Sequence, residues 1–522
     1  MAPVACALLV FSTHASTASG VPSALVSRAL GWANTNGVQM SPQPGSFVHA
    51  PLSLSPFPLS ADGFARARAL APIFNELVEA VASDPEWLLG VLEATLESDP
   101  FTGRLARVLR EATRAGPEAQ PLHLGIHRSD YMLDEPARAD GGGYEPARLL
   151  QIELNTIASS FGCLSARISQ LHAYVCAVAP ADVAAVLDGP AAAELAAGAE
   201  LPSNAALEML PDALAAAHAA YIAQVAGAPS AGAPPAGAPP VVVFVVQPGE
   251  RNVADQRLLE LALWERHGVQ AVRCTLAELA AGAQLRDGPA HPNGSPRPCL
   301  WVGGREVAVA YFRAGYSPDD YPTEAEWAAR LAIERSAAVK CPTVAYQLAG
   351  TKKVQQVLAE PGALERFVPS AEHAAALRAT FAGLFSLQTD DEYEAALRLT
   401  RADEDGYVLK PQREGGGNNI YGRDAAARLA AMRAGEREGY ILMERIRPRA
   451  RRLALARNNE ACITEAVCEL GVFGVFLGGG GQPALLNRAA GHLLRAKPLG
   501  TDEGGVAAGF AVLSSPLLER GI

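Results

Sequence analysis

Hydrophobic residues recur every three or four positions through residues 61–115, which predicts successive amphipathic helices. Glu76 and Glu79 fall on the opposite side of this pattern, so we expect both to face solvent. Residues 122–133 and 147–157 read instead as strands, separated by a glycine-rich turn. A further helical run is predicted for residues 163–178. The first half of the chain therefore predicts a mixture of helices and strands.

The second half begins after a segment rich in proline and alanine, residues 226–240, which predicts an extended linker. The apolar run VVVFVV that follows is typical of a buried parallel strand. Alternating strand and helix patterns after it predict an α/β domain over residues 241–345. In residues 346–522 we expect helices alternating with strands, the strands meeting in antiparallel hairpins and residues 478–481 forming one hairpin turn.

Composition narrows the class of protein. The chain has 522 residues, enough for two or three domains, and 49% of them are hydrophobic. A net charge of −11 argues against a nucleic-acid partner, and no apolar run reaches the roughly 20 residues of a membrane span. The eight cysteines form no C-x-x-C pair, which argues against a structural zinc site. We therefore expect a soluble protein with reduced thiols.

The leader, residues 1–20, has a short apolar run but no basic segment before it, which argues against a secretory signal. It also lacks acidic residues, as transit peptides do, yet it lacks arginine, which they contain. We expect a cytoplasmic protein. Import into a plastid or mitochondrion is the alternative.

The strongest chemical signal is LKPQREGGGNNIYG, residues 409–422. Consecutive glycines let backbone N–H groups approach an anion, and Lys410 supplies a point charge for phosphate. Glu414 suits a magnesium ion that takes carboxylate and phosphate oxygens together. Walker A, G-x-G-x-x-G, H-E-x-x-H and G-x-S-x-G sequences are absent from the chain. The pattern indicates a Mg-ATP-dependent enzyme with an anionic substrate.

Further candidates lie on predicted strands. Glu153 and Asn155 are two residues apart in QIELNT, so both side chains face one way and could share a hard cation, although such alternation also fits a solvated strand face. Arg313 in YFRAGY and Arg128 in HRSDYM each follow or end an apolar strand, where an arginine either clamps a carboxylate or is simply solvated. Arg495 in HLLRAK is a further basic candidate.

Together, these blocks resemble eukaryotic glutathione synthetase over residues 46–513. Five further segments carry the same resemblance: ERNVADQR, QLAGTKKVQQ, ILMERI, CELGVFGV and GGVAAGFAVL. The resemblance implies a mixed α/β (α+β) ATP-grasp fold in circularly permuted form. Residues 21–225 would carry the helical and first ATP-grasp part. Residues 241–345 would be an inserted parallel α/β substrate-binding domain, and residues 346–522 would complete the ATP-grasp part with a glycine-rich lid.

The activity implied is ligation of γ-glutamylcysteine with glycine by a homodimer. ATP would be the co-substrate, with two Mg²⁺ ions per subunit. Phosphorylation of the cysteinyl carboxylate would give an acyl phosphate, which glycine's amine attacks, releasing ADP and phosphate. The enzyme's part is then mostly charge neutralisation and positioning.

The resemblance also assigns roles residue by residue. Metal ligands would be Glu153, Asn155 and Glu414. The residues implied to be catalytic are Arg128, Lys352, Lys410 and Arg495. Of these, Lys352 and Lys410 would contact the phosphates, and Arg128 would stabilise charge on the transferring group. ATP would further contact Gly415, Gly416, Gly417, Asn418, Asn419, Tyr421, Met443, Glu444, Arg445, Ile446, Glu469, Lys497 and Glu503. The peptide and glycine would be held by Arg128, Ser159, Ser160, Glu250, Asn252, Gln256, Arg313, Tyr316, Arg495, Val506 and Ala507.

Two alternatives stay open at this point. A homoglutathione synthetase would use β-alanine, but that subgroup changes the alanines after GGV, and Ala507 and Ala508 are retained here. A non-catalytic nucleotide-binding scaffold would have lost Glu153, Glu414 or Lys410, and all three are present. The sequence also departs from the family in minor ways, with Arg445 in place of the usual lysine.

Overall fold

The computed structural model describes residues 20–114, 119–138, 140–225, 238–288, 297–412, 418–502 and 504–520. Four features predicted from the sequence lie wholly or largely outside these residues: the leader, most of the linker 226–240, the segment 413–417 with Glu414 and its glycines, and Glu503. Within the described part of the chain, no helix is long and apolar enough to cross a membrane.

The helical run predicted for residues 61–115 is confirmed as three helices, α2 (Ala61–Ala82), α3 (Pro85–Ser98) and α4 (Pro100–Arg114). Asp84 begins α3 by accepting a 3.0 Å hydrogen bond from the backbone of Trp87. The expectation that Glu79 faces solvent is wrong. Its carboxylate accepts a 2.6 Å hydrogen bond from the hydroxyl of Tyr346, because α12 packs against α2.

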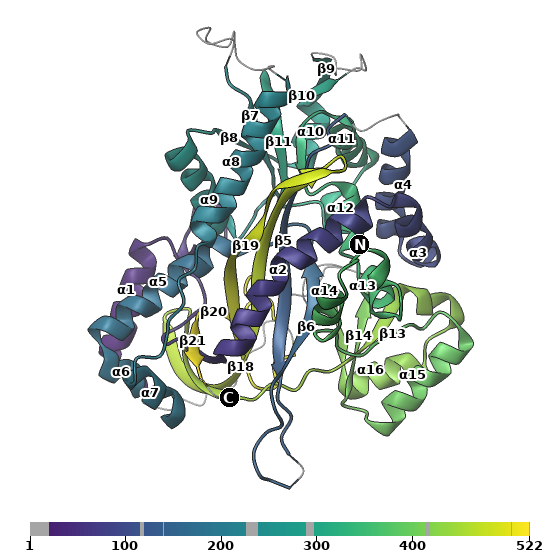
Figure 1. Cartoon of the computed structure of the whole chain (residues 1–522). Helices are drawn as coiled ribbons and strands as arrows, with labels where there is room; N and C mark the ends of the chain where they lie inside the picture. The colour runs from purple at the N-terminus through teal and green to yellow at the C-terminus, as the bar shows by residue number, and fades with distance from the viewer. Residues whose placement is uncertain are drawn as a thin grey trace.

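The remaining helices lie around a large sheet, some packed directly on its two faces and others packed on those helices (Figure 1). They are α1 (Ser23–Thr35), α5 (Gly162–Val178), α6 (Pro180–Ala184), α7 (Gly189–Ala196), α8 (Ala206–Val225), α9 (Val253–His267), α10 (Leu276–Gly282), α11 (Glu324–Arg335), α12 (Val344–Ala349), α13 (Lys352–Ala359) and α14 (Ala371–Arg378).

The large sheet has 13 strands in the described residues, ten of them in the order β17-β3-β20-β19-β18-β5-β12-β11-β10-β9. Of the other three, β6 pairs with β5, β7 pairs with β11, and β8 pairs with β7. Their bounds are β3 (Leu52–Ser53), β5 (His123–Asp134), β6 (Arg148–Asn155), β7 (Val241–Val245), β8 (Ala271–Cys274), β9 (Gln284–Asp287), β10 (Pro298–Val302), β11 (Arg305–Phe312), β12 (Val339–Cys341), β17 (Arg451–Arg457), β18 (Glu460–Gly479), β19 (Gln482–Pro498) and β20 (Val512–Ser514). Small pairs outside it are β1 (Gln39–Met40) with β2 (Val48–His49), and β4 (Phe57–Ser60) with β21 (Pro516–Glu519).

Two kinds of strand pairing predicted from the sequence are confirmed. The VVVFVV run forms β7, which is fully buried and runs parallel to β8 and β11. The strands β18 and β19 form a long antiparallel hairpin. Its turn requires Gly479, whose φ is +127°, because a Cβ there would lie 2.2 Å from the carbonyl oxygen of Pro121.

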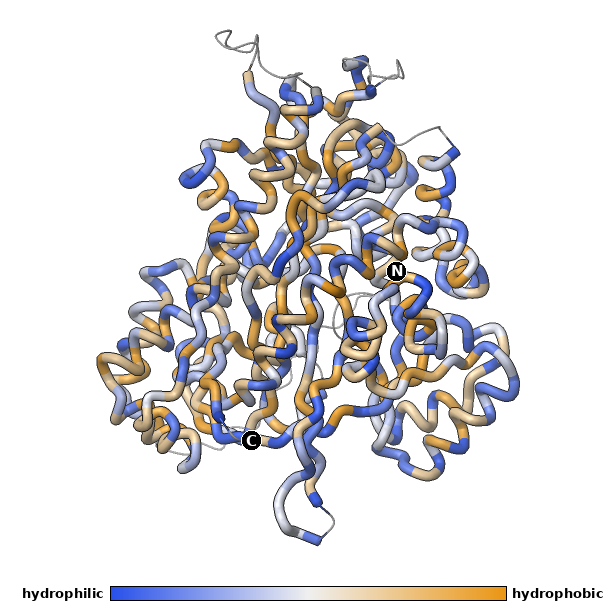
Figure 2. The backbone as a smooth tube through the Cα atoms, in the orientation of Figure 1, coloured by the Kyte–Doolittle hydropathy of each residue, from blue (hydrophilic) through white to orange (hydrophobic). Residues whose placement is uncertain are grey.

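Alternating residues of the hairpin build two cores on the two faces of the sheet. Leu470 and Leu494 join the cluster that contains α2, whereas Phe473 and Leu493 join the cluster that contains α5 and α8. Hydrophobic stretches follow these central strands, and the connection between β5 and β6 is mostly polar (Figure 2). The two cores thus determine where side chains of β5, β6, β18 and β19 stay uncovered, beyond the packed part of each strand.

A separate sheet of four strands has the order β13-β16-β14-β15. Its elements are β13 (Leu384–Phe385), β14 (Tyr407–Pro411), β15 (Ile420–Tyr421) and β16 (Tyr440–Glu444), with α15 (Asp390–Ala402) and α16 (Gly422–Ala430) packed on it. Short 3₁₀ helices are η1 (Pro318–Asp320), η2 (Leu364–Arg366) and η3 (Ala434–Gly439). The predicted mixed α/β class is confirmed.

Candidate active site

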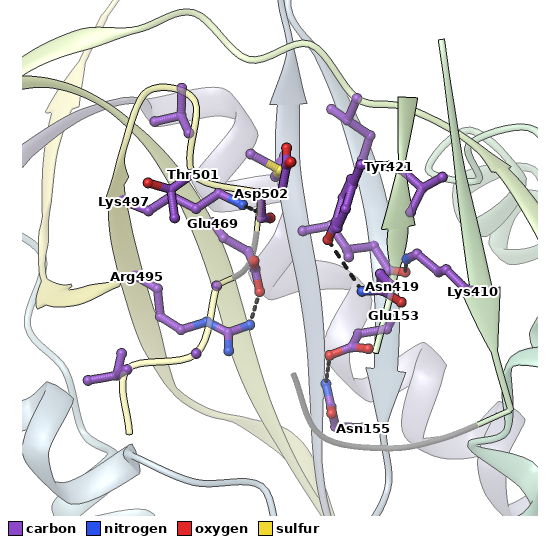
Figure 3. Close-up of a pocket in the computed structure, with 18 of the residues that line it drawn as sticks. Glu153, Asn155, Lys410, Asn419, Tyr421, Glu469, Arg495, Lys497, Thr501 and Asp502 are labelled. Atoms are coloured by element: carbon purple, nitrogen blue, oxygen red, sulfur yellow. Dashed lines mark hydrogen bonds and ion pairs between the residues drawn. The ribbon is translucent and has the colours of Figure 1, made fainter. Parts of the chain in front are cut away.

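A cavity of about 640 Å³ opens between the large sheet and the four-stranded sheet. Figure 3 shows side chains from both sheets pointing into it, with Glu153 and Asn155 on β6, Glu469 on β18, and Lys410 on β14. Nineteen of the residues implied by the family resemblance line it: Arg128, Glu153, Asn155, Ser159, Ser160, Tyr316, Lys352, Lys410, Asn419, Tyr421, Met443, Glu444, Arg445, Ile446, Glu469, Arg495, Lys497, Val506 and Ala507. Residues more than 300 positions apart in the chain therefore meet in one cavity.

Glu153 is the carboxylate at the centre of the cationic residues. Lys352 lies at the start of α13 and places its Nζ 3.8 Å from the Glu153 carboxylate. Lys410 is buried on β14 and donates a 3.0 Å hydrogen bond to the carbonyl of Ile152. Burial would raise the pKa of Glu153, but the charges of Lys352 and Lys410, with two arginines, lower it to about 2. The carboxylate is therefore ionised at neutral pH.

The residues present fit a magnesium ion. The ionised carboxylate of Glu153 and the amide of Asn155 face the same side of β6, and Asn155 Nδ2 donates to Glu153 Oε1 at 3.3 Å. That orientation leaves oxygens for a hard cation. No group of three His, Cys, Asp or Glu residues that could hold a metal exists within the described part of the chain. The donor set therefore suits an ion that takes its remaining ligands from phosphates and water.

Beside Glu153, two arginines lie on the same face of the large sheet. Arg128 on β5 makes hydrogen bonds of 2.6 and 2.8 Å to both carboxylate oxygens of Asp130. Arg495 on β19 donates to Asp130 at 3.1 Å and also to Glu469 on β18. Both arginines are mostly buried and line the cavity, so each can present a fixed positive charge to an anionic group.

The other wall belongs to the four-stranded sheet and to the segment that follows it. Met443 and Ile446 supply apolar surface, and Val408 on the neighbouring strand β14 adds to it. Asn419 donates a 3.3 Å hydrogen bond to the hydroxyl of Tyr421 (Figure 3). Apolar surface at the end of a strand can accept a purine, whose edge then hydrogen-bonds to backbone groups.

The loop after β19 forms the third wall. Lys497 donates to the carbonyl of Asp502, and Val506 and Ala507 line the cavity further on. Val506 is buried, whereas Ala507 beside it is partly exposed. Glu503, predicted to contact the nucleotide, lies outside the described residues.

Four residues predicted to hold the peptide do not line this cavity: Glu250, Asn252, Gln256 and Arg313. They form a second polar group next to it. Gln256 Nε2 donates to Glu250 at 2.7 Å, and the backbone N–H of Asn252 donates to the same carboxylate at 2.7 Å. The Asn252 side chain is 4% exposed and has no hydrogen-bond partner among the described residues. A buried amide without a partner suits a polar ligand.

Arg313 connects this second group to the cavity. Its guanidinium donates to the carbonyl of Ser159 at 2.6 Å and to the hydroxyl of Ser160 at 2.8 Å, and both serines line the cavity. Burial would lower the pKa of Arg313, yet Tyr311 and Asp255 beside it raise that pKa well above its ordinary value. Asn418 is exposed and does not itself line the cavity, although Asn419 next to it does.

Sequence reasoning missed several residues of the site. Asp130 follows Arg128 by two positions on β5, so the alternation rule for strands could have placed both on one face. Asp502 and Asp405 line the cavity from loops, where no periodic signal exists. Arg273 donates a 2.6 Å hydrogen bond to Gln256, and only the pairing of β7 with β8 brings it there.

Comparison with known proteins identifies the family. A model of the eukaryotic glutathione synthase ATP-binding domain matches residues 21–518. The chain belongs to the eukaryotic glutathione synthase family. Its relatives include the chloroplastic glutathione synthetase of Solanum lycopersicum, 42% identical over 90% of this chain and 77% of that protein. The glutathione synthetase of Homo sapiens is 38% identical over 90% of each chain, and that of Dictyostelium discoideum is 37% identical over 95% of this chain and 98% of that protein.

A solved structure shares the fold. A glutathione synthetase-like effector from Globodera pallida matches with a TM-score of 0.69 at 22% identity, covering 95% of this chain and 98% of that one. Family membership confirms the predicted enzyme class, an ATP-dependent ligase of glutathione biosynthesis with ATP as co-substrate.

Proposed function

We propose that the cavity ligates γ-glutamylcysteine with glycine at the expense of ATP, releasing ADP and phosphate. One observation carries the proposal: the ionised Glu153 lies among four cations that line the same cavity. We assign Lys352 and Lys410 to the phosphates, and Arg128 and Arg495 to carboxylates. An ATP-dependent ligase needs the terminal phosphate and the substrate carboxylate brought together in such a place.

The chemistry needs charge neutralisation more than proton transfer. Lys352 and Lys410 hold the phosphates, and Arg128 faces the oxygens of the group being transferred, where negative charge must be balanced. Attack by the cysteinyl carboxylate on the terminal phosphorus forms an acyl phosphate and releases ADP. Glycine's amine then attacks the acyl carbon, phosphate leaves, and the ammonium proton passes to solvent or phosphate. The buried walls reduce hydrolysis of the acyl phosphate by excluding water.

Substrate recognition follows from two sets of residues, those that line the cavity and the second polar group beside it. Arg495 and the loop with Val506 and Ala507 line the cavity and bind glycine. The dipeptide extends toward Glu250, Asn252 and Gln256. One extra methylene changes binding by only about 1–3 kcal/mol, so the preference for glycine over β-alanine is one of degree.

Glu153 and Asn155, with Glu414 from outside the described residues, would hold magnesium, two ions per subunit. The ions would neutralise charge on the phosphates. The glycine-rich segment 415–417 lies outside the described residues, and its role as a lid over the phosphates of a permuted ATP-grasp fold is part of our proposal, based on the sequence. Protection of this segment from protease by Mg-ATP is the expected result, and unchanged cleavage would contradict it.

The enzyme works as a homodimer. Phe47 and Val48 near β2, and Leu261 and Trp264 on α9, are exposed apolar side chains in elements that lie close to one another, since β1 contacts both β2 and α9. Light scattering after gel filtration should give twice the mass of one chain.

Since two plant relatives are named chloroplastic, import of the full chain into isolated chloroplasts tests whether it is an organellar form of a cytoplasmic enzyme.

The deciding experiment measures ADP release by the purified protein with Mg-ATP and γ-glutamylcysteine, with glycine or β-alanine supplied in parallel. Strong turnover with glycine and weak turnover with β-alanine is the expected outcome. Preference for β-alanine would move the assignment to homoglutathione synthesis. Tight ATP binding without turnover would instead favour a nucleotide-binding scaffold.

A further inference from the structure

Asp130 lies at the centre of the polar face of the large sheet. It is fully buried on β5, between β6 and β18, where it pairs with Glu153 on one side and Gly471 on the other. Its carboxylate accepts four hydrogen bonds. Two come from Arg128 at 2.6 and 2.8 Å, one from Asn155 at 3.0 Å and one from Arg495 at 3.1 Å.

These bonds reach across four neighbouring strands. Asn155 is on β6, Asp130 and Arg128 are on β5, and Arg495 is on β19, beyond β18. A side chain from β5 reaches one from β19 only if the strand between them leaves an opening at that level. The bond between Asp130 and Arg495 therefore depends on what β18 places between them.

Gly471 provides that opening. A Cβ at this position would lie 2.6 Å from Asp130 Oδ1 and 2.7 Å from Arg128 Cδ. Contacts this short force at least one of the two side chains to move. The absence of a side chain at Gly471 therefore permits Arg128 and Asp130 to lie across β18 toward Arg495.

We propose that Asp130 is the positioning residue of the site, and that Gly471 is the opening it requires. The carboxylate holds the guanidiniums of Arg128 and Arg495 and the amide of Asn155 in one fixed arrangement. This inference rests on the proposed function for the meaning of that arrangement. Fixing the donors before substrate binds spares the reaction the cost of orienting them.

A purely structural role for Asp130 makes a different prediction. A destabilised fold lowers the fraction of active molecules, so kcat falls while every KM stays unchanged. A positioning role acts on the residues around it. In the proposed function, Arg128 faces the dipeptide carboxylate and the group being transferred, and Arg495 faces the carboxylate of glycine. Lys352, Lys410 and Met443 also line the cavity but are held by other elements. KM for ATP should then change less than the KM values for the dipeptide and glycine.

The test compares three variants of the full-length enzyme. In Asp130→Asn the amide presents N–H groups to one of the guanidiniums, so we expect kcat/KM for γ-glutamylcysteine to fall by about 100-fold, with a rise in its KM as well as a fall in kcat. KM for ATP should rise less, through Asn155 alone. Gly471→Ala should give the same split. Gly474→Ala is the matched control. Gly474 is on the same strand as Gly471 but away from the site, and a Cβ there would lie 2.3 Å from the side chain of Asn75. It should lower thermal stability and leave all KM values unchanged.

Two results would overturn the inference. One is an equal fall in kcat with no change in any KM for Asp130→Asn. The other is a crystal structure of that variant with both guanidiniums in their wild-type positions. This measurement does not depend on activity, so it tests the inference even if the activity of Asp130→Asn is too low for kinetics. An inactive wild-type enzyme would contradict the proposed function instead, and the crystal structure would still decide the role of Asp130. Should Asp130→Asn not fold, the Gly471→Ala and Gly474→Ala pair gives the same comparison.

Discussion

Arg445, directly after β16, donates a 2.9 Å hydrogen bond to the carboxylate of Asp502, in the loop after β19. The two residues come from different sheets, and both line the cavity. Their ion pair thus connects the wall expected to hold the adenine with the wall expected to hold the glycine. Its side chains are 36% and 45% exposed, so its strength depends on salt.

Asp502→Asn is expected to raise KM for ATP, because the two walls separate more easily. An exposed ion pair of this kind contributes up to about 1 kcal/mol, which limits the change to roughly fivefold. The measurement is KM for ATP at 0.05 and 0.5 M NaCl in wild type and variant. The difference between them should shrink at high salt, and a difference that persists unchanged would argue against the ion pair.

Lys352 and Lys353 are adjacent on α13 and offer a matched comparison. Lys352 faces Glu153 in the cavity, whereas Lys353 Nζ donates to Gln356 at 2.7 Å and Gln388 at 3.0 Å. Lys352→Met should weaken ATP binding about 100-fold, as loss of a buried phosphate contact does. Lys353→Met should lower the melting temperature and leave ATP affinity unchanged, both measured by calorimetry. Similar affinities for the two variants would refute the assignment of Lys352.

Glu153 should remain ionised throughout the physiological range, because neighbouring cations lower its pKa to about 2. A depressed carboxyl pKa stabilises the fold fully above the unfolded value of 4.5, and that stability is lost as pH falls toward 2. The carboxyl ¹³C shift of Glu153, assigned by difference from Glu153→Gln, should not change between pH 8 and 5. A titration in that window would contradict the electrostatic picture. Glu153→Gln should itself reduce ligation about 100-fold or more.

Buried neutral histidines should make the fold sensitive to mild acid. Burial lowers the pKa of His127 and of His492 to about 3, and that of His172 to about 4. Below pH 6.5 the unfolded chain binds protons at these positions that the folded chain does not, so stability falls as pH decreases. Each histidine contributes a slope of up to about 1.4 kcal/mol per pH unit.

His127→Phe tests this linkage, since neither ring nitrogen of His127 has a hydrogen-bond partner among the described residues. The free energy of unfolding, measured in urea at pH 7 and pH 5, should differ less in His127→Phe than in wild type. His373, which is exposed on α14, provides the control variant His373→Phe. If both variants keep the wild-type pH dependence, His127 is not its source.

Local patterns predicted most elements that shape the site. The period of three to four over residues 61–115 gave the helices α2 to α4, and the apolar run at β7 gave a buried parallel strand. Glu79 shows where such patterns stop. Its position on the helix repeat looked solvated, but Tyr346, 267 residues away, bonds to its carboxylate.

The candidate site divides in the same way. The spacing of Glu153 and Asn155 determined that they share a face, since side chains alternate along any strand, and the blocks around Lys410 and Arg128 identified the family. The place of Asp130 beneath two arginines, and the contact of Arg445 with Asp502, depended on which strands lie next to each other. Strand order results from long-range burial of whole faces, and no local pattern encodes it. The sequence by itself thus determined the chemical groups and the family, and the tertiary structure decided which groups hold one another in place.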